Sequence, residues 1–177
     1  QLYHDSEMGL TQAFVNPGPW ATAHGPGLLE TPRRTLLCCW FAGTYEGDTD
    51  INIVVSRLEK GSDRWGDPTY VSHNDDRSDQ NPSLFLAPNG EIWCMYTSQL
   101  GRQSGKDNMQ YTAQVKRQVS RDDGLSWSEP EIVFPKEGTF SRQPIQVLSN
   151  GRWIYGSWLC TDSDSALAGD PSAFQVS

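Results

Sequence analysis

The sequence has 177 residues, a formal net charge of −8 at pH 7 and a pI near 4.7. Nucleic acid and anionic membranes are recognised by basic faces, so this acidic chain predicts neither as a partner. No apolar run is long enough for a membrane-spanning helix, and the sequence leaves the compartment open between a soluble cytoplasmic and a secreted protein. The four cysteines lie within apolar runs, which predicts buried thiols.

From the N-terminus onward, the chain is a succession of short strand-like stretches and turns. Leu10–Val15 is the first of these stretches. Three segments then follow one pattern, consisting of a proline, an apolar run, a turn and a second apolar run. They begin at His24, Gln80 and Arg142. This self-similarity predicts three structural repeats, each opening with a β-hairpin.

Further strand-like stretches follow each predicted hairpin. They are Ile51–Ser56 and Pro68–Ser72, then Ala113–Ser120 and Pro130–Phe134, and finally Ala173–Ser177. No helical period persists, and 16 glycines with 11 prolines suit a chain of many turns. The sequence therefore predicts an all-β fold. Four antiparallel strands in a repeat of about 60 residues are typical of a β-propeller blade.

The repeats divide the chain into residues 23–79, 80–141 and 142–177, which we expect to form two blades and an incomplete third. Residues 1–22 are predicted to supply a strand that closes a neighbouring blade. Three blades are too few to close a ring. We therefore expect half of a six-bladed propeller, with the other half supplied by further sequence or by a second chain. The first residue is Gln1, not Met, which suggests a processed or partial chain.

The stretch SRDDGLSWSEP begins at Ser120, between the third and fourth strands of the second repeat. Its adjacent carboxylates could serve catalysis or a calcium loop, but the spacing of an EF-hand is absent. A structural role explains the residue types better. Asp122 can accept hydrogen bonds from turn amides, Gly124 can adopt a positive φ, and Trp127 can bury its ring against the blade.

The pattern S-x-D-x-G-x-x-W in this stretch resembles the Asp-box of sialidase-like, BNR-repeat β-propellers. AHGPGLLE and CWFAGTYEGDTDINIVVSR are similar to the first blade of that family, QNPSLFLAPNGEIWCMY to the second and FSRQPIQVLSNGRW to the third. The resemblance implies a six-bladed propeller of sialidase type with a ligand site at one mouth of the central channel. It also implies activity on glycans, since members are commonly described as exo-α-sialidases.

The innermost strands of a propeller line its channel, so the entrances of these strands converge at one mouth. The loop between the second and third strands of a blade opens at the same end. The residues that we expect to meet there are His24, Glu46, Asp48, Asp50, Gln80, Asn81, Arg142 and Gln143.

By this resemblance, an aspartate in the first blade's loop acts as acid/base, a tyrosine paired with a glutamate is the nucleophile, and three arginines hold the substrate carboxylate. Asp48 or Asp50 matches the loop aspartate by position. His24-Gly25-Pro26 stands where the first arginine's Arg-x-Pro motif is expected. A histidine lacks the bidentate fork of a guanidinium, so this site departs from a sialidase.

We therefore expect an exo-glycosidase that removes a terminal, acidic sugar from glycans by acid/base chemistry. Its predicted catalytic residues are Asp48, Asp50 and His24, and its predicted sugar-binding residues are Glu46, Gln80, Asn81, Arg142 and Gln143. Two alternatives stay open: a non-catalytic glycan-binding or scaffold propeller, and a polysaccharide lyase that uses His24. No metal or other cofactor is predicted, because no ligand spacing supports one.

Overall fold

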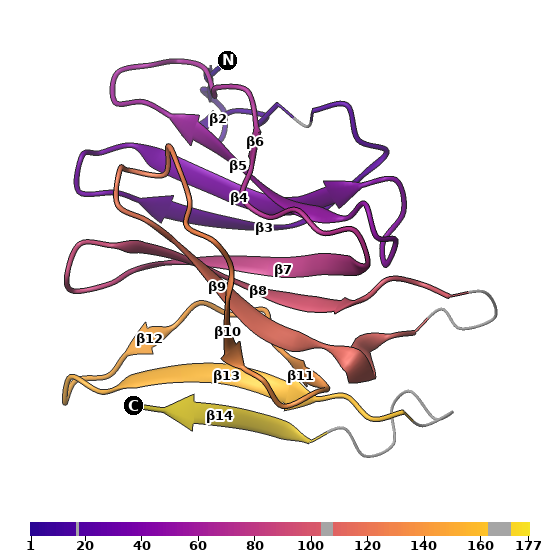
Figure 1. Ribbon diagram of the computed structural model, residues 1–177. Helices are drawn as coiled ribbons and strands as arrows, with labels where there is room; N and C mark the ends of the chain where they lie inside the picture. Colours follow the sequence, from indigo (N-terminus) through magenta and orange to yellow (C-terminus); the bar gives the residue numbers. More distant parts are fainter. Residues whose placement is uncertain (17, 104–107, 163–170) are drawn as a thin grey trace.

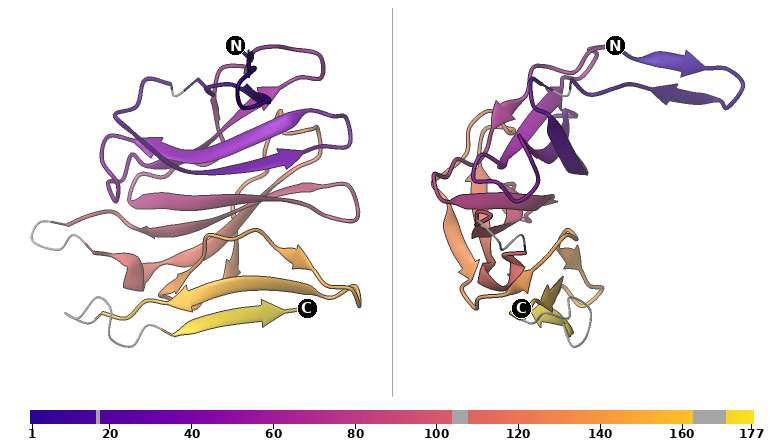
Figure 2. Two further views of the ribbon diagram at one scale, coloured as in Figure 1. Left: turned by 180° about the vertical axis from the view of Figure 1, so that it is seen from behind. Right: turned by 90° about the vertical axis from the view of Figure 1, so that its right-hand side faces the viewer.

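A computed structural model describes residues 1–16, 18–103, 108–162 and 171–177 (Figure 1). Within these ranges the chain is built of antiparallel strands, with one short 3-10 helix, η1 (Gln110–Thr112). None of the helical structure described there is long and apolar enough to cross a bilayer. Three four-stranded sheets follow one another along the sequence and stack face to face, as Figures 1 and 2 show. Each sheet corresponds to one predicted repeat.

Blade 1 pairs its strands in sequence order. They are β3 (Thr22–Glu30), β4 (Leu36–Gly43), β5 (Asn52–Leu58) and β6 (Thr69–Tyr70). The middle strands β4 and β5 are buried along almost their whole length. Their continuous apolar runs suit a sheet that is covered on both faces.

Blade 2 repeats this arrangement with longer strands. They are β7 (Arg77–Leu86), β8 (Ile92–Leu100), β9 (Gln114–Ser120) and β10 (Glu131–Phe134). Gly90 adopts a φ of 86° in the turn between β7 and β8. It belongs to the pair Asn89-Gly90, a sequence typical of two-residue hairpin loops, and the structure has the predicted hairpin there.

Blade 3 has an interrupted innermost strand. β11 (Thr139–Phe140) and β12 (Gln146–Val147) both pair with β13 (Trp153–Leu159), while β14 (Ser172–Val176) pairs with the other edge of β13. Arg142 and Gln143 lie in the gap between β11 and β12.

The N-terminal segment forms a separate two-stranded sheet, which projects from the stack in Figure 2. β1 (Tyr3–Asp5) pairs with β2 (Leu10–Gln12). The strand expected from residue 10 onward thus pairs within its own hairpin, and its place in a neighbouring blade stays a prediction. The three sheets begin at Thr22, Arg77 and Thr139, slightly before the predicted repeat boundaries.

The repeated proline marks a β-bulge in the first two hairpins. The pairing of β3 with β4 shifts between His24 and Gly27, and the pairing of β7 with β8 shifts between Gln80 and Ser83. Gly25 and Asn81 take equivalent places within these bulges, with φ values of 66° and 51°. Because proline has no N–H to donate to the ladder, a bulge accommodates it without losing a hydrogen bond.

The main core lies between blades 1 and 2. It contains Leu37, Ile53 and Val55 from blade 1 and Leu84 and Tyr96 from blade 2, among others. All four cysteines are buried thiols, as predicted. Burial raises the pKa of Cys38 to about 11, so this thiol stays protonated at neutral pH.

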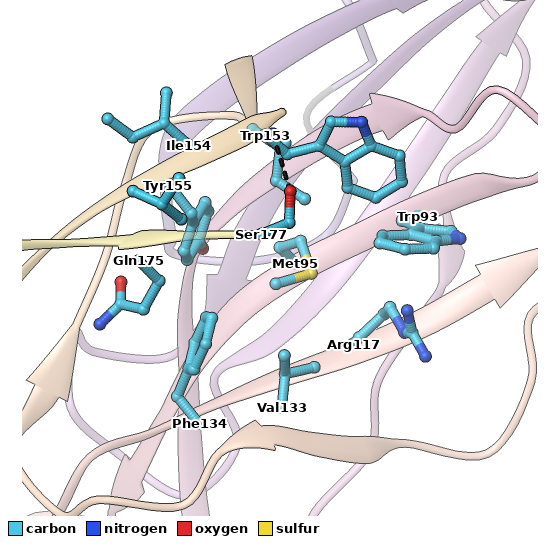
Figure 3. A pocket seen from close by; sticks show the side chains of 12 residues that line it. Trp93, Met95, Arg117, Val133, Phe134, Trp153, Ile154, Tyr155, Gln175 and Ser177 are labelled. Atoms are coloured by element: carbon cyan, nitrogen blue, oxygen red, sulfur yellow. Dashed lines mark hydrogen bonds between the residues drawn. The ribbon is translucent and has the colours of Figure 1, made fainter. Parts of the chain in front are cut away.

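A second core joins blades 2 and 3. The rings of Trp93 and Trp153 meet edge to face, with centroids 5.4 Å apart. Beside them lies an apolar cavity of about 240 Å³, shown in Figure 3. The backbone nitrogen of Trp153 donates to Ser177 Oγ at 2.9 Å along one side of this cavity.

The SRDDGLSWSEP stretch forms the tip between β9 and β10 and has the structural role expected of it. Ser120 Oγ accepts a hydrogen bond from the Gly124 amide at 2.8 Å, and Asp122 Oδ1 accepts one from the Ser126 amide at 2.9 Å. Bonds from the hydroxyl and amide of Ser126 lower the pKa of Asp122 to about 2. Trp127 packs against the core between blades 1 and 2.

Asp123, the second carboxylate of this tip, fastens blade 2 to blade 1. Its Oδ2 accepts a hydrogen bond from Thr35 Oγ1 at 2.7 Å, and its carboxylate and backbone oxygens both meet the guanidinium of Arg57. Thr35 directly precedes β4, the second strand of the first hairpin, so the tip lies at the hairpin end of the sheets. The loops expected to form the mouth lie at the opposite end (Figure 1).

Candidate functional site at the channel mouth

The loops at one end of blades 1 and 2 bring together polar side chains from four elements. The β4–β5 loop, the start of β3, the start of β7 and the segment around η1 contribute to this mouth. The β4–β5 loop is held firmly by blade 2. The Arg102 amide donates to the Gly47 carbonyl at 2.8 Å, and the Arg102 guanidinium lies 4.5 Å from the centroid of the Tyr45 ring.

His24 and Glu46 form a pair across blade 1. Nδ1 of the imidazole lies 3.1 Å from Oε2 of the carboxylate. Phe41 supports the imidazole edge to face, with ring centroids 5.7 Å apart. The side chains of His24 and Glu46 are 60% and 49% exposed, so a solute in the mouth can reach both.

A cleft of about 230 Å³ opens beside Glu46, and we call it the amide cleft. It is lined by Glu46, Gly47, Gln80, Gln99, Asn108 and Gln110. Side-chain amides offer both donors and acceptors, and the glutamate adds a charged acceptor. Such a lining suits a ligand that carries several hydroxyl groups.

Asp48 and Asp50 face a different cleft on the other side of the same loop. This cleft, of about 300 Å³, is lined by Thr44, Thr49 and Arg102 in addition to the two aspartates. The Asp50 carboxylate accepts hydrogen bonds from the amide and the hydroxyl of Thr44, at 3.0 Å and 2.5 Å. Asp50 therefore closes the loop on itself, while no such bond from a described residue is seen at the Asp48 carboxylate.

Arg142 and Gln143 face a third cleft, on the channel side of the innermost strands. Pro26, Pro82 and Pro144 line it with them, so the three repeat prolines meet here. The cleft has a volume of about 200 Å³. Asn81 lies close by, since a Cβ built on Gly25 would be 3.6 Å from its Oδ1.

The predicted site residues thus gather at one mouth, but they divide among three clefts. His24, Glu46 and Gln80 lie at the amide cleft or beside it, Asp48 and Asp50 share the second cleft, and Arg142 and Gln143 share the third.

Several polar residues of the mouth are not among the predicted catalytic and sugar-binding residues. They include Gln99, Arg102, Asn108 and Gln110. Asp79 precedes the bulge of β7 and is fully buried. Burial raises its pKa, while Asn74 donates a hydrogen bond to its carboxylate and Lys116 lies near enough to oppose that shift. These contacts assign Asp79 to the support of the mouth.

No group of three or more histidine, cysteine, aspartate or glutamate side chains that could hold a metal ion occurs among the residues described.

A BNR repeat-like domain model matches residues 34–174, which is more than half of the chain. The chain belongs to the BNR repeat-like family. The match runs through all three blades, and the Asp-box of blade 2 lies within it. No curated protein sequence is significantly similar to this one.

Solved structures with the same fold support this assignment. A Dyadobacter fermentans protein of unknown function is 19% identical, with a TM-score of 0.65 over 92% of this BNR repeat-like chain. The NanB sialidase of Streptococcus pneumoniae is 10% identical, with a TM-score of 0.64 over 92% of the chain. A Penicillium chrysogenum α-L-arabinanase, solved with arabinobiose, is 19% identical, with a TM-score of 0.59 over 87%.

This chain covers 52%, 46% and 46% of these three structures, so it spans about half of their length. Three blades over half of the length correspond to a ring of six. The expectation of an all-β, six-bladed propeller of sialidase type, of which this chain supplies three blades, is confirmed. In fold, the chain is similar to the propellers of a sialidase and an arabinanase.

Proposed function

We propose that this protein is a carbohydrate-active enzyme of the glycoside hydrolase class that removes a terminal sugar from a glycan at the channel mouth. The observation that carries the proposal is the His24–Glu46 pair beside a cleft lined by amides. Hydrogen bonding to sugar hydroxyls needs paired donors and acceptors, and side-chain amides supply both. The neighbours that act on sialosides or arabinosides lend further support to a glycan ligand.

Asp48 is our proposed proton donor. It lines the second cleft, so the scissile bond would lie between that cleft and the amide cleft. Glycosidic bond cleavage commonly uses a carboxylic acid to protonate the leaving oxygen. Asp48 is half-buried and stands on the loop next to Glu46, whereas the Asp50 carboxylate is already bonded to Thr44. We therefore assign Asp50 to holding the loop, and His24 with Glu46 to orienting the sugar.

The acidic sugar predicted from the sequence depends on Arg142. Its guanidinium would bind a carboxylate, but it faces the proline-lined cleft and not the amide cleft. An acidic substrate would therefore have to extend from one cleft to the other, with Asn81 and Gln143 along its path. Whether the sugar is acidic stays a prediction.

The experiment that tests this function measures release of aryl alcohol from a panel of aryl glycosides of neutral and acidic sugars. We expect turnover of at least one substrate, and a loss of about 100-fold or more in kcat for Asp48→Asn. Binding of glycans without turnover would favour the alternative of a glycan-binding propeller. An unsaturated, ultraviolet-absorbing product that depends on His24 would favour the lyase.

A further inference from the structure

Gln99 differs from the other described residues that line the amide cleft because part of its amide is buried without a partner. The residue lines the amide cleft and is 3% exposed. Its Oε1 atom accepts no hydrogen bond from any residue that the structure describes. A buried acceptor without a donor destabilises the folded protein unless a bound molecule supplies the donor. This atom therefore points to a ligand that can donate a hydrogen bond.

The sheet of blade 2 fixes the position of this acceptor. Gln99 pairs directly with Ser78, and Gln80 follows two residues after Ser78 on the same face of the sheet. The Gln80 amide nitrogen donates to Ser78 Oγ at 3.1 Å, and all three residues are buried. The floor of the cleft is thus preorganised, which lowers the entropic cost of binding.

Glu46 is the one charged side chain among the described residues that line the cleft, and its charge limits which ligands can bind there. Glu46 provides a carboxylate there, and none of the lining residues described is a lysine or an arginine. A carboxylate or phosphate group on the ligand could only accept hydrogen bonds. It would meet acceptors at both Glu46 and Gln99 and would be repelled by the glutamate charge. A neutral sugar can donate a hydrogen bond from one hydroxyl to Glu46 and from another hydroxyl to Gln99.

We propose that the amide cleft is a subsite for an uncharged sugar ring, in which Gln99 Oε1 accepts a hydrogen bond from a ring hydroxyl. The inference rests on the proposed function and narrows its substrate class. A neutral sugar, and not an acidic one, occupies this cleft, and Gln99 is a residue that determines this specificity.

Matched sugars test the inference directly. Calorimetry would compare methyl glucoside with methyl glucuronide and methyl galactoside with methyl galacturonide, and would add arabinobiose as a neutral pentose probe. The two members of each hexose pair differ only at C6, where the acidic sugar has a carboxylate in place of a hydroxymethyl group. We expect at least one neutral sugar to bind, and to bind about tenfold or more tightly than its acidic counterpart.

Three variants complete the test. Gln99→Met should weaken neutral binding about tenfold without lowering the Tm, because it removes an unpartnered acceptor. The matched control is Gln114→Met on β9, whose side chain does not line the cleft and whose change should leave binding unaltered. Glu46→Gln should reduce the difference in affinity between each neutral sugar and its acidic counterpart.

The outcomes separate the inference from the function on which it rests. Tighter binding of the acidic members, or neutral binding that Gln99→Met leaves unchanged, would overturn the neutral subsite while glycosidase activity could stand. A fall in Tm for Gln99→Met would show that the amide serves the fold. If no sugar bound and none were hydrolysed, both the subsite and the proposed function would be wrong.

Discussion

Nδ1 of His24 lies 3.1 Å from Oε2 of Glu46, and this contact joins the innermost strand of blade 1 to the loop that borders the amide cleft. The two residues are separated by a hairpin in the sequence and meet because β3 and β4 run antiparallel. The bulge that follows His24 and the support from Phe41 fix the imidazole at the rim of the mouth.

The pair should matter for glycan binding more than for folding. Glu46→Gln removes the charge of an acceptor but keeps its shape, and we expect an affinity loss of about tenfold for the sugar that the wild type binds best. Tm should change little, because both side chains are largely exposed and such pairs contribute about 0–1 kcal/mol. Glu7→Gln, in the turn between β1 and β2, is the matched control. Equal losses in Glu46→Gln and Glu7→Gln would refute this role.

Substitution of Asp48 should impair catalysis, whereas substitution of Asp50 should impair stability. Asp50→Asn should destabilise the protein by about 1 kcal/mol, because the Asp50 carboxylate accepts two hydrogen bonds from Thr44. Asp48→Asn should leave unfolding by urea nearly unchanged and lower kcat far more strongly. Measuring both properties in both variants checks the assignment, and the reverse pattern would exchange the two roles.

Gly124 should be intolerant of any side chain. Its φ of 79° belongs to the left-handed region, and a Cβ at this position would lie 2.9 Å from Leu37 Cδ1. We expect Gly124→Ala to cost about 2 kcal/mol or more in the free energy of unfolding, from backbone strain and from crowding of the neighbouring blade. Gly90→Ala is a useful comparison, since its φ is similar but its Cβ would contact nothing within 4 Å. Equal costs would mean that crowding by Leu37 contributes nothing.

The ionised carboxylate of Asp122 should stabilise the folded protein at neutral pH, and this stabilisation should be lost in acid. The pKa of Asp122 in the folded protein is lowered to about 2 from its ordinary value of 3.8, so the native state favours the ionised carboxylate. The stabilisation is therefore complete above about pH 4 and is lost as the pH falls through about 2. The Tm difference between wild type and Asp122→Asn should be constant from pH 7 to 5 and shrink below pH 4. A difference that grew in acid would have the wrong sign.

The sequence predicted the fold almost completely because its strands repeat a pattern that only one architecture explains well. The prolines, the Asn-Gly turns and the Asp-box motif are local signals with local physical causes, and each appears where it was expected. β11 and β12 are the exception. The innermost strand of blade 3 is broken around Arg142, and no local signal distinguished SRQPIQV from its unbroken counterparts.

The site was predictable only as a region. Sequence position placed eight residues at one mouth, because the entrances of innermost strands converge in a propeller. Sequence position could not assign these residues to separate clefts, because the direction of each side chain depends on the folded structure. Gln99 is not among the predicted site residues because it lies near the end of an apolar strand, where polar side chains are usually exposed to solvent. In the structure it is buried and lines the amide cleft together with Gly47 and Gln110.

A crystal structure of the protein soaked with arabinobiose would test the central claim most directly. We predict a sugar ring in the amide cleft, with a hydroxyl within hydrogen-bond distance of Gln99 Oε1 and another at the Glu46 carboxylate. Sugar bound only against Arg142 in the proline-lined cleft, with the amide cleft unoccupied at saturating ligand, would contradict the account.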